Sequence, residues 1–316
     1  MDVIWLSVLG LVLCGWFVLD GFAVGLGVLH AWIGRDDRER RTLLAGVGPF
    51  FLGGEVWLVV AAGVLIAAFP ALEVEVFTAF RPLIVLLLIA WAVRSASWWM
   101  RSRREDEGWR RGWDAGITAG SIGFAATWGM LLANLARGVP SETPSVLALF
   151  DPLASLGAVT VVLLLAVHGA TFASIRVRGE TAERARTAAR VMAPLAFLAF
   201  AGTAMWVVYA EGVAAEGGAA AIVLCAVGAV AVGAVWPLHR MRTPAAFAAS
   251  AVAAAALPLS VGVAHSGALL GHAASVDVLT RLAPMVLPVL FLALSTQVFV
   301  WWIFRRRVGP GTVRFF

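Results

Sequence analysis

The 316-residue chain carries a formal net charge of +5, and 61% of its residues are hydrophobic while only 14% are charged. This composition is typical of an integral membrane protein and excludes a mainly soluble, globular chain. All 24 basic residues are arginines, a bias that base composition explains as well as function does. The positive charge therefore does not indicate a nucleic-acid-binding protein.

Long apolar runs follow one another along the chain. Each can cross a hydrocarbon core of about 30 Å as a helix, whereas the strands of a membrane β-barrel alternate apolar and polar residues over about ten positions. We therefore predict an all-α, polytopic transmembrane protein that forms a single membrane domain over residues 1–316. The runs predict about nine helices, over residues 3–32, 46–70, 77–100, 113–136, 150–175, 190–210, 217–238, 244–270 and 280–304.

The connections between the runs alternate in charge. Arginines follow each odd-numbered run, at Arg35, Arg38, Arg40, Arg41, Arg101, Arg103, Arg104, Arg110, Arg111, Arg176, Arg178, Arg184, Arg186, Arg190, Arg240, Arg242, Arg305, Arg306 and Arg307. The other connections carry acids, at Glu73, Glu75, Glu142, Glu211, Glu216 and Asp277. Because arginine-rich connections stay in the cytoplasm, we predict an outside N-terminus and a cytoplasmic C-terminus. The arginines are expected to set topology and touch anionic headgroups of membrane lipid, and the sequence supports no dedicated lipid site.

The first run contains one acid, Asp20, which is framed by Gly21, Gly25 and Gly27. Small residues suit close helix packing, so Asp20 is open to two roles, as an interhelical hydrogen-bond acceptor and as a proton relay. At about 1.5 Å per residue it lies roughly 25 Å from the outer end of its helix, in the cytoplasmic half of the membrane.

The second run contains Glu55, which falls in the same half of the membrane. A carboxylate at mid-membrane costs on the order of 2.5 to 3.5 kcal/mol on insertion scales, so Glu55 needs a compensating partner or role. Two interpretations remain open. One is a structural carboxylate that is protonated or neutralised by Arg94 of the third run, and the other is a proton relay that loads from the cytoplasm.

Arg94, His168 and Gln297 also fall in this half of the membrane and are candidate charge or hydrogen-bond partners. Helix rotation decides whether they meet, and the sequence does not specify it. His168 is open to a role as a haem ligand and to one as a hydrogen-bonded interhelical histidine. No two histidines share a helix at a pairing distance, so neither a bis-histidine haem nor a metal site is predicted. Cys14 and Cys225 lie inside apolar runs and do not indicate a disulfide.

Short motifs occur in a fixed order along the chain. They are LDGFAVGLG (19–27), GRDDRERRTLL (34–44), GPFFLGGEVWL (48–58), AAFP (67–70), RSASWWMR (94–101), WDAGITAGS (113–121), NLARGVP (134–140), HGATF (168–172) and WWIFRRRV (301–308). Each is weak alone. In this order, and on this number of helices, they resemble subunit II of cytochrome bd-type quinol oxidases over nearly the whole chain.

The resemblance implies the haem-free subunit of a respiratory complex that oxidises quinol and reduces dioxygen to water in a bacterial cytoplasmic membrane. Haem b, haem d and the quinol-oxidation loop would belong to subunit I, and this chain would ligate no cofactor. A bound quinone and a small accessory subunit are left open. Glu55 and Asp20 would match acids of the family's motifs and line a proton path from the cytoplasm.

Three positions depart from the family's pattern. Where the family usually reads WDGNE, this chain has Leu52 in place of the first acid and Gly54 in place of the asparagine, and Ala23 replaces the second acid of a DGFD motif. Either Glu55 and Asp20 with water suffice for a proton path, or subunit I supplies all protons and this chain is a scaffold.

Two other classes of function remain open. A secondary transporter would show internal repeats and helices broken near the midplane. Pro258, Pro284 and Pro288 are the residues that would break helices, but the two halves of the chain show no convincing repeat. A structural membrane partner without chemistry of its own overlaps with the oxidase subunit.

Overall fold

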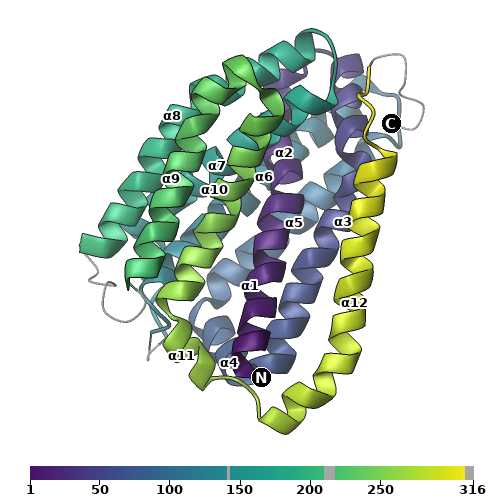
Figure 1. Cartoon of the computed structure of the whole chain (residues 1–316). Helices are drawn as coiled ribbons and strands as arrows, with labels where there is room; N and C mark the ends of the chain where they lie inside the picture. The colour runs from purple at the N-terminus through teal and green to yellow at the C-terminus, as the bar shows by residue number, and fades with distance from the viewer. Residues whose placement is uncertain (141–142, 210–217, 310–316) are drawn as a thin grey trace.

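The computed structural model describes residues 1–140, 143–209 and 218–309 as a bundle of long helices (Figure 1). Nine of the helical segments in this part of the chain are long and apolar enough to cross a membrane, which confirms the predicted all-α, multi-pass fold. Glu142, Glu211 and Glu216, which entered the topology prediction, lie outside the described residues.

The elements follow in the order α1 (Asp2–Leu19), α2 (Gly21–Ile33), α3 (Asp37–Ala68), α4 (Pro70–Ala79), α5 (Arg81–Arg101), α6 (Glu107–Ala136), the 3-10 helix η1 (Val146–Phe150), α7 (Pro152–Arg176), α8 (Glu180–Tyr209), α9 (Gly218–Met241), α10 (Thr243–Ala264), α11 (Ser266–Gly271) and α12 (Val276–Ile303). α1 and α2 together make the first span. α4 and α11 are short helices between spans.

Several helices begin well before their apolar runs. α3 starts at Asp37, about two and a half turns ahead of the predicted span, and α6 starts at Glu107, about one and a half turns ahead of it. Capping explains both starts, because Asp36 accepts a hydrogen bond from the backbone of Glu39 and Asp106 accepts one from the backbone of Trp109. Polar first turns therefore extend these helices beyond the hydrocarbon core.

α7 occupies the centre of the bundle and is the most buried of the spans. Two glycine contacts allow its close packing. A Cβ added to Gly169 would lie 2.2 Å from the backbone nitrogen of Leu26 on α2, and one added to Gly157 would lie 2.6 Å from the carbonyl oxygen of Gly129 on α6. Helix backbones approach this closely only where side chains are absent.

The N-terminus and the end of α12 lie at opposite ends of the bundle (Figure 1). The arginine-rich connections share the end at which α12 finishes. There Arg184, at the start of α8, forms an ion pair of 2.5 Å with Glu39, near the start of α3. Val308 pairs with Val177 in an isolated parallel bridge at the same end. The arginine-rich connections are thus gathered at one end of the described bundle.

Candidate functional site

Asp20 and Arg94 form a buried ion pair where α1 meets α2. Nη2 of Arg94 lies 3.1 Å from Oδ1 of Asp20, and Nη1 lies 3.3 Å from Oδ2. Both residues are 0% exposed. Asp20 separates the two helices, although its N–H still donates to the carbonyl of Trp16 at 2.9 Å. Each charge is therefore compensated by the other inside the bundle.

An aromatic ring and two glycines enclose this pair. The guanidinium carbon of Arg94 lies 4.8 Å from the centre of the Phe51 ring, in range of a cation–π interaction. A Cβ added to Gly54 would lie 2.8 Å from Cβ of Asp20, and one added to Gly120 would lie 2.6 Å from the backbone nitrogen of Arg94. The absence of side chains at both glycines lets α3 and α6 close over the ion pair.

Glu55 follows Gly54 on α3 but has different partners. Its Oε1 accepts hydrogen bonds from Oγ of Ser95 at 2.8 Å and from Nε1 of Trp91 at 3.1 Å, both on α5. Nη1 of Arg94 lies 4.0 Å from the same oxygen. The Glu55 side chain is 17% exposed, whereas that of Asp20 is 1% exposed. Arg94 therefore makes its short contacts with Asp20, and Glu55 keeps an opening to the surface of this chain.

His168 contacts the same region from α7. Its Nε2 lies 3.0 Å from the carbonyl oxygen of Val18, and its Nδ1 lies 2.8 Å from Oγ of Ser250. The ring also stacks on Phe247, with centroids 5.0 Å apart and planes 4° apart. Both ring nitrogens are thus engaged. This geometry favours the interhelical hydrogen-bonding role of His168 over the haem-ligand role.

Gln297 approaches from α12. A Cβ added to Gly53 would lie 2.9 Å from Oε1 of Gln297, while its buried Nε2 has no hydrogen-bond partner in the described part of the chain. Of the five candidates from the sequence, Asp20 and Glu55 are both brought within 4.0 Å of Arg94. His168 and Gln297 lie beside them without a hydrogen bond to any of the three.

A second network of charges, which sequence reasoning missed, joins α2, α3, α5 and α6 at their arginine-rich ends. Asp114 accepts from Nε of Arg101 at 2.5 Å and from Nη1 of Arg40 at 2.9 Å, and Nε2 of His30 lies 2.7 Å from its Oδ1. Arg101 also donates to Asp37 at 2.9 Å. The sequence signal was that Asp37, Arg40, Arg101 and Asp114 all lie inside the short motifs, at 34–44, 94–101 and 113–121.

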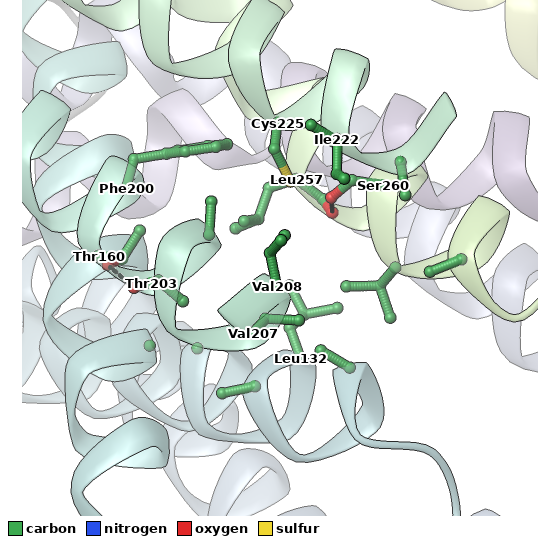
Figure 2. A pocket seen from close by; sticks show the side chains of 18 of the residues that line it. Leu132, Thr160, Phe200, Thr203, Val207, Val208, Ile222, Cys225, Leu257 and Ser260 are labelled. Carbon is green, nitrogen blue, oxygen red and sulfur yellow. Dashed lines mark hydrogen bonds between the residues drawn. The ribbon is translucent and has the colours of Figure 1, made fainter. Parts of the chain in front are cut away.

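An apolar pocket lies elsewhere, among α6, α7, α8, α9 and α10 (Figure 2). It has a volume of about 70 Å³, well below the roughly 300–1,000 Å³ of most small-molecule sites. Thr160 and Thr203 in its wall lie 2.8 Å apart and each donates to a carbonyl of its own helix, as Ser260 does. These hydroxyl donors are already engaged, so the pocket has no evident role in charge or proton chemistry.

The family profile described as "Cytochrome bd terminal oxidase subunit II" matches residues 1–304. The chain belongs to this family. It is 34% identical over 215 residues to "Cytochrome bd-I ubiquinol oxidase subunit 2" of Escherichia coli (strain K12), covering 65% of this chain and 57% of that relative. It is 30% identical over 201 residues to "Cytochrome bd ubiquinol oxidase subunit 2" of Bacillus subtilis (strain 168), covering 62% and 60%. The match thus spans less than two thirds of these relatives' length.

The fold agrees with a solved structure of a cytochrome bd protein. One chain of "The structure of bd oxidase from Geobacillus thermodenitrificans" matches with a TM-score of 0.78 and 17% identity, covering 96% of this chain and 98% of that one. At this identity the likeness concerns the fold alone. Together with the nine candidate spans among the described residues, it shows that this member of the family is a multi-pass membrane protein.

The three residues that the resemblance marks as departures from the family's motifs, Leu52, Gly54 and Ala23, have different surroundings. Leu52 is 58% exposed, so its side chain points away from the Asp20–Arg94 pair. Ala23 is fully buried in α2, and Gly54 lies against Asp20. A side chain as large as asparagine at residue 54 would displace Asp20 from its present position. Glycine at residue 54 therefore leaves the space that Asp20 needs to reach Arg94.

Proposed function

We propose that this chain is subunit II of a respiratory cytochrome bd-type terminal oxidase in a bacterial cytoplasmic membrane. It would pair with a subunit I that carries haem b and haem d, oxidises quinol and reduces dioxygen to water. The observation that carries the proposal is the family match over residues 1–304. The names of the relatives, which are ubiquinol oxidase subunits, agree with it.

In this proposal the chain acts as one membrane domain with the arginine-rich end in the cytoplasm. Haem supplies the electron transfer and oxygen chemistry in the complex, and its assignment to subunit I leaves this chain with structural and proton-handling tasks. The hydrogen bonds of His168 support the assignment of the haems to subunit I, because both ring nitrogens already have partners and neither is left for a haem iron. A bound quinone and a small accessory subunit remain compatible with it.

Glu55 is the residue that we propose for holding a proton on its way from the cytoplasm. Asp20 is paired with Arg94 at 3.1 Å and is enclosed, so its carboxylate has no opening to the surface of this chain. Glu55 is only partly buried, and its Oε1 is oriented by Ser95 and Trp91. Arg94 at 4.0 Å would stabilise the carboxylate after proton release without pairing closely with it. The step is a reversible protonation at the Glu55 carboxylate.

The alternative of a secondary transporter receives no support from helix breaks at the proline residues. Pro258 lies inside the continuous α10, and Pro284 and Pro288 lie inside the continuous α12. The first span is interrupted at Asp20, between α1 and α2, but an ion pair occupies that position. The oxidase subunit therefore remains the proposal that the geometry supports best.

Purification of the protein from its native membrane through a tag on this chain tests the proposal. We expect a second hydrophobic subunit to copurify, an absorption spectrum with haem b and haem d bands, and oxygen consumption on addition of quinol. A haem-free protein that purifies alone and accumulates solute in vesicles would overturn the proposal in favour of a transporter.

A further inference from the structure

Buried nitrogen atoms without partners cluster where α9 ends beside α8. His239, on α9, is 6% exposed, and neither ring nitrogen has a hydrogen-bond partner among the described residues. On α8, Nε of Arg186 is also buried and unpartnered, although Nη1 of this arginine pairs with Glu183. Buried polar atoms without partners are rare in folded proteins. Their clustering indicates that a polar group from outside the chain completes the site.

Helix register places Arg190 at the same level. Gly233 of α9 packs on Phe197 of α8, with only 3.2 Å between an added Cβ and the ring. From this contact α9 runs six residues to His239, about 9 Å, and α8 runs back seven residues to Arg190, about 10 Å, at 1.5 Å per residue. Arg186 and Arg190 both interact electrostatically with His239. Arg190 makes no ion pair with any described residue.

The first turn of α10 adds further positive potential. The chain leaves α9 and enters α10 at Arg242, whose N–H donates to the carbonyl of Leu238 at 2.7 Å. No side chain caps α10, and Pro244 in its first turn has no N–H, so the N–H groups of Thr243 and Ala245 carry the positive end of the helix dipole. The guanidinium of Arg240 lies nearby, stacked 5.0 Å above the Trp236 ring. Figure 1 shows α8, α9 and α10 side by side at one edge of the bundle.

We infer that Arg186, Arg190, His239 and the first turn of α10 form a binding site for the phosphate of an anionic phospholipid. We call it the α8–α9 phosphate site. Arginine and imidazole N–H groups and an uncapped helix start are the donors that bind phosphate in proteins. The single nearby acid, Glu183, is already paired with Arg186, so the site keeps a net positive charge.

Exposed apolar side chains next to the site favour a lipid over free phosphate. Val191 and Leu195 on α8 are 63% and 51% exposed, and Trp236 on α9 is 45% exposed. They lie on the membrane side of Arg190 and His239, where acyl chains attached to a bound phosphate would run. Tryptophan at this level is typical of the membrane interface. The chain thus offers a polar site and an adjoining apolar surface to the two parts of one phospholipid.

Native mass spectrometry of the protein as purified, with its subunits, tests the inference. The protein in detergent is titrated with dioleoyl phosphatidylglycerol or with the zwitterionic dioleoyl phosphatidylcholine. We expect tight retention of one phosphatidylglycerol and about tenfold or greater weakening in Arg190→Gln and in His239→Phe, since each removes a donor to a charged group. Arg103→Gln is the matched control, because Arg103 is an exposed arginine at the same end of the bundle.

Equal retention by the wild type and both variants, or equal retention of the two lipids, would overturn the inference. If the variants do not fold, the inference is tested on the wild type, by measuring its melting temperature as each lipid or inorganic phosphate is added. We expect phosphatidylglycerol to raise the melting temperature more than phosphatidylcholine or millimolar inorganic phosphate does. An equal rise with inorganic phosphate would show a free-anion site in place of a lipid site, and no rise with either would show that water alone completes it.

Discussion

Asp20 and Glu55 are both carboxylates within reach of Arg94, but they differ in enclosure. Asp20 forms the short ion pair, and Glu55 lies 4.0 Å from the guanidinium with part of its side chain exposed. Membrane depth, which can be counted along a helix, placed these three residues in one half of the bilayer. It could not show which acid Arg94 faces, because that depends on the rotation and neighbours of each helix.

Glu55→Gln tests the proton role at the residue scale. The amide keeps the size and the acceptor oxygen for Ser95 and Trp91 but cannot carry a proton through the site. If Glu55 relays protons, quinol-driven oxygen consumption by the purified complex should fall on the order of tenfold or more, with haem content unchanged. Glu73→Gln, at the opposite end of the bundle, is the control. Turnover equal to that of the wild type would mean that Glu55 is structural or dispensable.

Asp20→Asn should instead lower stability. It removes the short ion pair of the fully buried Arg94 and leaves only Glu55, 4.0 Å away, as an acid near the guanidinium. Breaking a buried pair on one side costs up to about 3–5 kcal/mol. Thermal unfolding in detergent measures the loss. Because the two residues are coupled, the double variant Asp20→Asn/Arg94→Gln should lose less than the sum of the two single variants. Additive losses would contradict the ion pair.

The network around Asp114 shows a further limit of prediction from residues. His30, Arg40 and Arg101 each lie near a helix end, where polar side chains are expected at a membrane surface whether or not they meet. Their convergence on Asp114 requires the ends of α2 and α5 and the starts of α3 and α6 to lie at one level of the bundle. No spacing within a single helix encodes that arrangement.

At the scale of elements, hydropathy predicted the spans well, because long apolar segments have no other stable place in the chain. It did not predict the interruptions. The first run divides at Asp20, the predicted run 77–100 begins inside the separate helix α4, and the predicted run 244–270 divides at His265 into α10 and α11. These interruptions depend on local backbone geometry and packing partners, so apolar content alone does not predict them.

The contact between α2 and α7 predicts a large effect from one methyl group. In Gly169→Ala the new Cβ would lie 2.2 Å from the Leu26 backbone nitrogen, so the helices must separate, at a cost of about 1–3 kcal/mol. Gly63→Ala is the matched control, because nothing lies within 4 Å of its Cβ. Melting temperatures in detergent should fall for the first variant and not for the second. Equal melting temperatures would mean that α2 and α7 pack less closely.

At the scale of the whole molecule, charge and shape act together. The arginine-rich connections gather at the end of the bundle where α12 finishes, and the N-terminus lies at the other end (Figure 1). The odd number of candidate spans among the described residues agrees with this separation. The α8–α9 phosphate site belongs to the arginine-rich end, so its predicted lipid would come from the leaflet that this end faces.

Cysteine accessibility tests that orientation. In a background where Cys14 and Cys225 are replaced by serine, single cysteines are placed by Arg103→Cys, at the arginine-rich end, and by Asp277→Cys, at the other end; both positions are exposed. Because arginine-rich connections are retained in the cytoplasm, a membrane-impermeant maleimide should label residue 277 in intact spheroplasts and residue 103 only after the membrane is opened. The reverse pattern would place the arginine-rich end outside, and Glu55 would then lie in the outer half of the membrane, too far from the cytoplasm to load protons from it.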